Sequence, residues 1–404
     1  MSRQNVDGTR EAPFSAEEFE ARRQRVRELA VAEGLDALLV ADPANIYYLT
    51  GYDAWSFYTP QLLFVPVDGD LRFFAREMDA NGAHRTITQV PGDRIFGYPE
   101  TYIHQVDVHP GDWIAESLRE LGYGGALRVG YEGDAAFFTV RTYRSLVDGL
   151  PSWNLVESHN LVNWARLIKS DAEIAYMRQA GRICEIAMNT AFAGLRPGRP
   201  QNQVAADVMA AQARGEGDVD GDYASIVPMF PTGAGADTPH LTWADTPTPR
   251  GLPISVELAG AHRRYHAPLA RTAIIGSPQP DLERLAGVTD EALEAALEVV
   301  REGSTSDDVA RAFTAVLDRN GYSKNSRLGY SIGVGYPPDW GERTVSIREG
   351  DTTVLHTNMT FHLIAGMWLT GMGYEVSESI RVTPTGCETF SSIPHGLIRL
   401  DSGR

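Results

Sequence analysis

The chain has 404 residues, 43% of them hydrophobic, and carries a formal net charge of −17. A chain of this length buries an ample core and is more typical of two domains than of one. The acidic excess argues against a nucleic-acid backbone or an anionic membrane as partner, because both would be repelled. A cationic small molecule is compatible with this charge.

The two cysteines, Cys184 and Cys387, lie far apart without CxxC spacing. This arrangement predicts two reduced thiols instead of a disulfide framework or a zinc site. The N-terminal stretch MSRQNVDGTREAPFS is polar and lacks the apolar run of a signal peptide. No stretch approaches the roughly 20 apolar residues of a membrane span. We therefore expect a soluble, cytoplasmic protein.

The first predicted element is an amphipathic helix over residues 15–33, which Ser15 and Glu18 begin with a capping box. The run LDALLVAD then suits a strand buried on both faces, and PANIYYLTGYDAWSFY is expected to be a loop. QLLFVPV and DLRFFA flank an Asp-Gly turn and predict a hairpin, and ALRVGYE alternates as a strand does. Residues 1–160 therefore predict an α/β domain.

A second domain is predicted over residues 161–404. Ser170 and Glu173 form another capping box at the start of a helix. Two long helices, over residues 281–302 and 306–320, each end at a glycine, and β-rich segments lie on either side of them.

Five stretches of the chain occur in the order and spacing of one enzyme family. They are RLIKSDAEIAYMRQAG, HRRYHAPLART, GYSIGVGY, NMTFHLIAGMW and EVSESIRVTPTG. Over essentially its whole length the chain resembles the creatinase/aminopeptidase P/methionine aminopeptidase family. The resemblance implies a creatinase-like α/β domain over residues 1–160 and an α+β domain with the pita-bread fold over residues 161–404.

Metal-dependent members of that family hold a pair of divalent ions with two Asp, one His and two Glu. The matching positions here are Glu257, Pro268, Tyr330, Ile364 and Ser377. Proline and isoleucine have no donor atom, and tyrosine and serine are poor ligands for such a site. One carboxylate cannot hold two ions. The chain therefore resembles the metal-free, creatinase-like branch, and we expect neither a metal nor another cofactor.

Longer strings resemble the ectoine hydrolases within this branch, among them PTGAGADTPHLTW and RLGYSIGVGYPPDWGERT. This resemblance implies hydrolysis of the cyclic amidine ring of ectoine or hydroxyectoine to N-acetyl-2,4-diaminobutyrate. One stretch departs from the pattern, because residues 369–373 read LTGMG where those enzymes carry acidic and aromatic residues.

The departure at residues 369–373 leaves alternatives open. One is a creatinase-fold enzyme that acts on a different cyclic amidine or amino-acid-derived substrate in a biosynthetic pathway. Another is a catalytically inactive pita-bread protein used for binding. A metal-dependent prolyl peptidase is disfavoured by the missing ligands.

The expected catalytic residues are Glu257, His240 and His266. Ring opening must bring an oxygen nucleophile to the amidinium carbon and protonate a departing nitrogen. Glu257 is expected to act as nucleophile or as the base that activates water. His240 lies where creatinase-type enzymes carry a catalytic histidine, and His266 either orients the substrate or is a hydrogen-bonded strand histidine.

Substrate-binding residues are also expected in the second domain. Glu375 and Glu378 lie three positions apart in a strand pattern, so at most one should face the pocket, and Glu378 is preferred. Arg343, or Arg264 in its place, is expected to bind the substrate carboxylate. Tyr330, at the position of the lost histidine, completes this set.

Aromatic residues of the first domain are expected at the same site. In the creatinase branch this domain of a second subunit reaches over the active site, and the matching loop contains Trp55 and Phe57. Their rings would close on a flat cationic ring. We therefore expect a homodimer whose partner N-terminal domain completes the site, with a small zwitterionic cyclic amidine as substrate.

Overall fold

The computed structural model describes residues 11–217 and 219–400. The chain divides into two compact units, Met1–Arg166 and Leu167–Arg404. The division lies six residues beyond the expected boundary at residue 160, so a short helix stays with the first unit. Within the described ranges, no helix combines the length and the apolar character needed to cross a bilayer. The expectation about the N-terminal leader rests mainly on residues 1–10, which lie outside those ranges.

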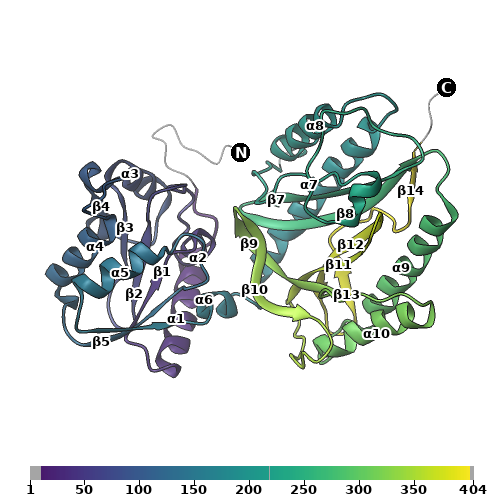
Figure 1. The fold of residues 1–404 in the computed structure, drawn as a ribbon. Helices are drawn as coiled ribbons and strands as arrows, with labels where there is room; N and C mark the ends of the chain where they lie inside the picture. The colour runs from purple at the N-terminus through teal and green to yellow at the C-terminus, as the bar shows by residue number, and fades with distance from the viewer. Residues whose placement is uncertain (1–10, 218, 401–404) are drawn as a thin grey trace. The chain divides into compact units, whose positions relative to one another are not determined.

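The first unit is built on a six-stranded mixed sheet in the order β4-β3-β2-β1-β5-β6 (Figure 1). Its strands are β1 (Ala37–Val40), β2 (Leu62–Pro66), β3 (Arg72–Arg76), β4 (Ile95–Tyr98), β5 (Leu127–Tyr131) and β6 (Trp153–Glu157). Its α-helices are α1 (Ala16–Ala32), α2 (Pro43–Thr50), α3 (Glu77–Thr86), α4 (Pro110–Leu118), α5 (Val140–Gly149) and α6 (Leu161–Ala165). The predicted α/β fold and the β2–β3 hairpin are confirmed.

The expected loop after β1 was wrong over the residues that form α2. Asp42 caps this helix by accepting a hydrogen bond from the Ala44 amide, and Pro43 occupies the first turn. Gly51 ends the helix with a φ of 75°, a left-handed conformation that glycine adopts without strain. These signals are local, and the aromatic content of the stretch obscured them.

The second unit contains an eight-stranded sheet with the main order β10-β9-β11-β12-β8-β14. β7 pairs with β8 and β13 pairs with β12 beside this path. The strands are β7 (Pro253–His262), β8 (Tyr265–Ile275), β9 (Gly329–Tyr336), β10 (Asp339–Ile347), β11 (Thr360–Leu369), β12 (Met372–Val382), β13 (Cys387–Thr389) and β14 (Ile398–Leu400).

Two pairs of helices cover this sheet (Figure 1). α7 (Asp171–Gly194) and α8 (Gln201–Arg214) share a core with β7 and β8. α9 (Pro280–Val299) and α10 (Ser306–Arg319) share another core with β10, β11 and β12. The capping box of Ser170 at the start of α7 is confirmed, as is the α+β architecture.

A close approach between α7 and β7 fixes the position of the β7–β8 hairpin. A Cβ atom added at Gly260 would lie 2.0 Å from the carbonyl oxygen of Ala180 in α7, so only glycine fits there. The strand is thereby pressed onto the helix along one face, which leaves its other face for polar residues.

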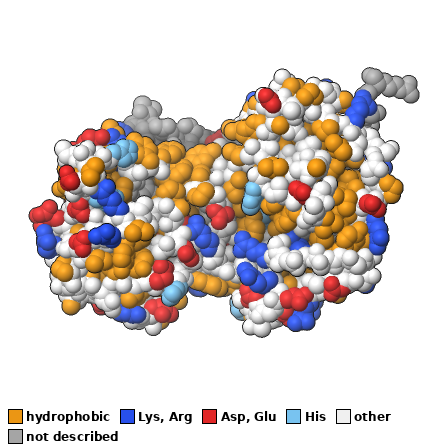
Figure 2. All heavy atoms as spheres, viewed as in Figure 1, with side chains coloured by type: hydrophobic (Ala, Val, Ile, Leu, Met, Phe, Trp, Pro, Cys, Tyr) orange, Lys and Arg blue, Asp and Glu red, His pale blue; other side chains and the backbone are white. Residues whose placement is uncertain are grey.

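The surface carries both signs of charge in spite of the acidic excess. Figure 2 shows acidic and basic side chains interspersed with apolar ones on the face in view. This mixture of charges is more typical of a protein that binds a small ligand than of one that binds a nucleic acid along its surface.

Candidate functional site

Glu257 lies in the middle of the β7–β8 hairpin. The turn residues Arg263 and Arg264 have φ angles of 49° and 66°, which close the hairpin so that Glu257 pairs with Ala270. Its neighbours on β7, Val256 and Leu258, pack into the core shared with α7 and α8. Side chains alternate along a strand, so the Glu257 carboxyl points to the opposite, inner face. It is only 3% exposed, so it is not a surface carboxylate.

Glu375 on β12 is the partner of Glu257, and we call these two residues the acid pair. Both are buried, and their carboxyl groups lie close enough for each to affect the pKa of the other. Burial, then the charge of Glu375, raises the pKa of Glu257 well above its usual value. Burial raises the pKa of Glu375 to about 7, against the opposing effects of the Lys324 charge and of the neighbouring Glu257 carboxyl. Near neutral pH Glu257 therefore keeps its proton, and Glu375 is the member of the pair that ionises.

Lys324 supplies the positive charge beside the acid pair. Its Nζ donates to the carbonyl oxygen of Gly366 at 2.7 Å and lies 4.5 Å from the ring centroid of Trp368. Gly366 is the β11 residue directly opposite Glu375. Burial lowers the pKa of Lys324 to about 8, and the charge of Glu375 opposes this change. Lys324 thus favours the ionised form of Glu375.

Tyr330 and Ser377, two of the residues at lost ligand positions, are joined by a buried histidine. The Tyr330 hydroxyl lies 2.9 Å from Nδ1 of His362, and Nε2 of His362 lies 2.7 Å from Oγ of Ser377. Trp340 Nε1 donates to the Tyr330 oxygen at 2.9 Å, and the Ala270 amide donates to the Ser377 oxygen at 2.7 Å. Sequence reasoning missed His362, because a single histidine in an apolar strand gives no distinctive signal.

This chain of hydrogen bonds borders the acid pair. Burial, then the charge of Glu257, raises the pKa of Tyr330, so its hydroxyl stays protonated. Ser377 follows Glu375 by two residues on β12 and therefore lies on the same face of the strand. The inner face of the sheet thus carries the acid pair, Tyr330 and Ser377 together.

Glu378, the preferred of the two glutamates, lies on the other face of β12, away from Glu257. Its carboxylate accepts hydrogen bonds from Arg271 and, at 2.9 Å, from His395. These two partners make it part of a buried structural ion pair. Glu375, the weaker candidate, is the one that reaches Glu257.

His266 is fully occupied by the protein. Its Nδ1 lies 2.9 Å from the Arg264 carbonyl oxygen, and its Nε2 accepts from the Ser225 amide at 3.0 Å. Burial lowers the pKa of His266 to about 4, so the ring is neutral with its proton on Nδ1. The structure therefore favours the hydrogen-bonded strand histidine, and a catalytic role for His266 stays a prediction.

His240 lies in an irregular segment beside β7. The Phe230 amide donates to the carbonyl oxygen of Leu241, and Met229 pairs with Glu257 across an isolated bridge. The backbone next to His240 is therefore hydrogen-bonded to the segment that pairs with β7. The side chain of His240 is exposed. The structure does not bring this ring into the buried cluster.

The two candidate arginines have different surroundings. The guanidinium of Arg264 packs over Tyr223 and Tyr336, 4.3 and 5.2 Å from the ring centroids, and is 7% exposed. Arg343 lies where the pairing of β10 with β9 is irregular, with a φ of 52° and its Nε 3.9 Å from the Asp339 carboxylate. A left-handed arginine in a strand is unusual and marks a constrained position. Arg343 is also more exposed than Arg264.

Trp55 and Phe57 form a stacked pair in the first unit. Their ring centroids are 4.4 Å apart, and Trp55 also contacts Phe137 edge-on. Phe57 is 63% exposed and the adjacent Tyr58 is 66% exposed, so these two are not core aromatics. The loop therefore presents an aromatic surface to its surroundings.

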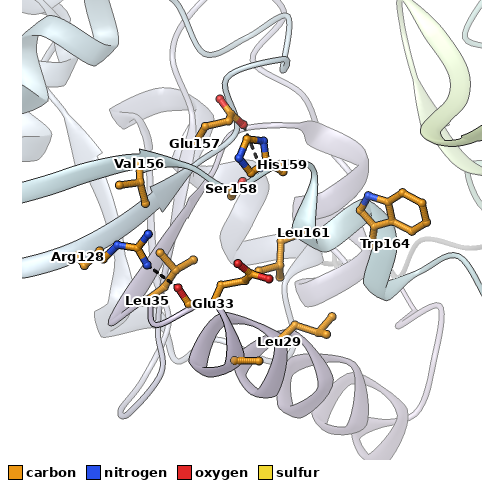
Figure 3. A pocket seen from close by; sticks show the side chains of 11 residues that line it. Leu29, Glu33, Leu35, Arg128, Val156, Glu157, Ser158, His159, Leu161 and Trp164 are labelled. Carbon is orange, nitrogen blue, oxygen red and sulfur yellow. Dashed lines mark hydrogen bonds between the residues drawn. The ribbon is translucent and has the colours of Figure 1, made fainter.

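The first unit also has a cavity of about 450 Å³, which Figure 3 shows from close by. Its polar residues bind within the unit: Arg128 donates to the Glu33 carbonyl oxygen, and the Glu157 carboxylate accepts from the His159 amide at 3.2 Å. The residues that line it include none of the predicted site residues. We therefore place the candidate site at the acid pair.

Comparison with known proteins identifies the family. Residues 175–384 match metallopeptidase family M24, and residues 22–168 match the creatinase/prolidase N-terminal domain. The chain belongs to metallopeptidase family M24. This M24 chain is 41% identical to the ectoine hydrolase of Halomonas elongata over 392 residues, which is 95% of this chain and 98% of that one.

Two further M24 comparisons have similar coverage. An uncharacterized hydrolase/peptidase of Sinorhizobium fredii is 41% identical over 390 residues, 96% of this chain and 99% of that one. The solved structure of a prolidase from Thermococcus sibiricus superposes with a TM-score of 0.82 at 18% sequence identity. The superposition covers 95% of this chain and 99% of the prolidase chain. That structure shows the shared fold, and the pita-bread prediction is confirmed.

The residues of this M24 chain do not fit the metal that the family name implies. Among the described residues, no group of three or more His, Cys, Asp or Glu side chains could hold a metal ion. Pro268 and Ile364 offer no donor atom, and Tyr330 and Ser377 are bound to His362. The acid pair alone gives two carboxyl groups, fewer than a pair of divalent ions requires.

Proposed function

We propose that this protein hydrolyses the cyclic amidine ring of ectoine or hydroxyectoine to N-acetyl-2,4-diaminobutyrate. The observation that carries this proposal is the buried acid pair, Glu257 and Glu375, in a chain 41% identical to an ectoine hydrolase. A pair with one proton supplies both a base and an acid, the two groups that hydrolysis of an amidine requires.

The acid pair suits the charge of the substrate. An amidinium is a planar cation with N–H donors, and the pair offers a single negative charge in a buried setting. Once its proton has passed to Glu375, Glu257 acts as nucleophile or activates water for attack on the amidinium carbon. The shared proton goes to the departing ring nitrogen, and the sum is one water added to the substrate. Arg343 is proposed to bind the substrate carboxylate.

We further propose that the reaction needs no metal and that the enzyme is a cytoplasmic homodimer. The donor set described above supports the first point. The exposed ring of Phe57, stacked on the half-buried Trp55, supports a role in covering the site of a second copy. Both cysteines are free, which is compatible with a reducing compartment.

The alternative of a different cyclic amidine rests on the LTGMG stretch. The structure makes this stretch a tight β11–β12 hairpin in which a Cβ at Gly373 would lie 1.6 Å from the Ala236 carbonyl oxygen. The backbone at Ala236 therefore occupies the space that a larger residue at position 373 would need. An inactive binding protein is disfavoured, because two adjacent buried carboxyls destabilise a fold that does not use them.

The test is incubation of the purified protein with ectoine and, separately, hydroxyectoine, with EDTA and no added metal. Mass spectrometry should show the substrate mass increased by one water, with a product that matches N-acetyl-2,4-diaminobutyrate. Turnover that disappears in EDTA and returns with manganese would contradict metal independence. No product from either compound under both conditions would overturn the proposed substrate and favour the alternative.

A further inference from the structure

The hydrogen bonds around His362 leave one hydrogen unassigned. A neutral imidazole has one donor and one acceptor nitrogen. His362 is fully buried, its Nδ1 bonds the Tyr330 hydroxyl, and its Nε2 bonds the Ser377 hydroxyl. Each hydroxyl oxygen also accepts an N–H, from Trp340 and Ala270 respectively.

Only two arrangements of hydrogens satisfy these contacts. With the proton on Nδ1, His362 donates to Tyr330 and Ser377 donates to Nε2, so the Tyr330 hydrogen is left over. With the proton on Nε2, His362 donates to Ser377 and Tyr330 donates to Nδ1, so the Ser377 hydrogen is left over. In both arrangements, one hydroxyl at a time has a hydrogen to donate to the inner face of the sheet.

We propose that Tyr330, His362 and Ser377 form a proton relay in which a change of the His362 tautomer moves a donor hydrogen from one end to the other. As Tyr330 gives its hydrogen to an acceptor, it takes the Nδ1 hydrogen. Nε2 takes the Ser377 hydrogen, and Ser377 takes a new one. One proton enters at Ser377 and one leaves at Tyr330, and the imidazole carries no charge before or after the transfer.

The two ends of the relay lie beside the two members of the acid pair. Tyr330 is close enough to Glu257 for that charge to affect its pKa, and Ser377 shares a strand face with Glu375. The relay therefore connects the surroundings of the two carboxyls by a second route. For the proposed hydrolysis, on which this role rests, it would carry one proton from the side of Glu375 to the side of Glu257, and a transfer in the opposite direction would return His362 to its first tautomer. His362 is thus a positioning residue that acts through both hydroxyls.

The relay can be tested without an activity assay, because NMR reports which nitrogen of His362 carries the proton. ¹⁵N-histidine is incorporated into the full chain, and the imidazole nitrogens are observed by NMR; His362→Gln assigns the signal. Wild type should show intermediate shifts at both nitrogens, from exchange between tautomers. A bare acceptor is tolerated better than a buried bare N–H. Tyr330→Phe should therefore place the proton on Nε2, and Ser377→Ala should place it on Nδ1.

The same variants give a kinetic test. Both are nearly isosteric, and thermal unfolding checks that they fold. Each should lower kcat on ectoine by about tenfold or more, with little change in KM. The double variant should fall no further than the single ones, because either change interrupts one pathway. One fixed tautomer in wild type and both variants, or additive losses in kcat, would overturn the relay. Absence of ectoine turnover in wild type would count against the proposed function, and the tautomers would still decide the relay.

Discussion

At the scale of single residues, Glu257 carries most of the proposed chemistry. It lies in a strand whose ten residues are all buried, yet it is ionisable and stands next to a second carboxyl. A buried acid of this kind has an unfavourable solvation free energy unless it is neutral or paired. The raised pKa of Glu257 is the physical sign of that cost.

Replacing Glu257 by Gln should lower kcat by about 100-fold or more, because the amide is neither a nucleophile nor a base. The midpoint of thermal unfolding should not fall, because the change removes a buried ionisable group. Turnover is measured by mass spectrometry and unfolding by circular dichroism. Glu349→Gln, at an exposed glutamate, is the matched control and should keep the wild-type rate. A fully active Glu257→Gln enzyme would refute the assignment.

Lys324 should set the acidic limb of the pH dependence. Its positive charge lowers the pKa of Glu375, so Lys324→Met should raise that pKa above about 7. The ionised form of the pair is then lost at higher pH, and the acidic limb of kcat/KM moves upward. Lys324→Arg retains the charge and should keep the limb near its wild-type position. Equal displacement in both variants would mean that charge is not the cause.

At the scale of elements, the sequence predicted what local signals encode. The cap at Ser170 and the β2–β3 hairpin are set by neighbouring residues, and both were correctly predicted. The choice between Glu375 and Glu378 could not be made from the sequence, because it depends on what lies opposite each one. Arg271 reaches Glu378 from a strand more than a hundred residues earlier in the chain. His362 was missed because its role comes from the pairing of β11 with β9 and β12.

The β11–β12 hairpin should tolerate little change at its tip. A Cβ at Gly373 would collide with the Ala236 carbonyl oxygen, a backbone atom that cannot rotate away. Gly373→Ala should therefore lower the free energy of unfolding by about 1–3 kcal/mol, as overpacked sites do. Gly386→Ala is the control, because no atom lies within 4 Å of its added Cβ. Denaturant unfolding measures both, and equal stability of the two variants would contradict the predicted collision.

At the scale of the whole molecule, the proposed dimer makes each site composite. The acid pair belongs to the second unit, whereas Trp55 and Phe57 belong to the first. In a dimer of the proposed kind, a complete site takes its acids from one copy and its aromatic cover from the other. Substitutions in the two units should then behave as changes in separate partners.

Mixed dimers give the measurement. Glu257→Gln and Phe57→Ala should each reduce activity in a homodimer, the second because the exposed ring no longer covers the substrate. Coexpression of the two variants should partly restore turnover, because each mixed dimer has one site with both residues intact. Two copies of the same variant mixed together are the control. Mixed preparations no more active than the better single variant would argue against composite sites.

The close packing of Gly373 against Ala236 also limits which sequence changes can accumulate at this hairpin during evolution. The two residues are far apart in the chain, yet the hairpin tip occupies the space that a larger side chain would need. The Gly371 amide, at the same tip, donates to the Asp237 carboxylate at 2.9 Å. A descendant with a bulky or acidic tip would have to rebuild the segment around Ala236 at the same time. New substrate preferences at this edge are therefore expected to arise by paired replacements, with the acid pair unchanged.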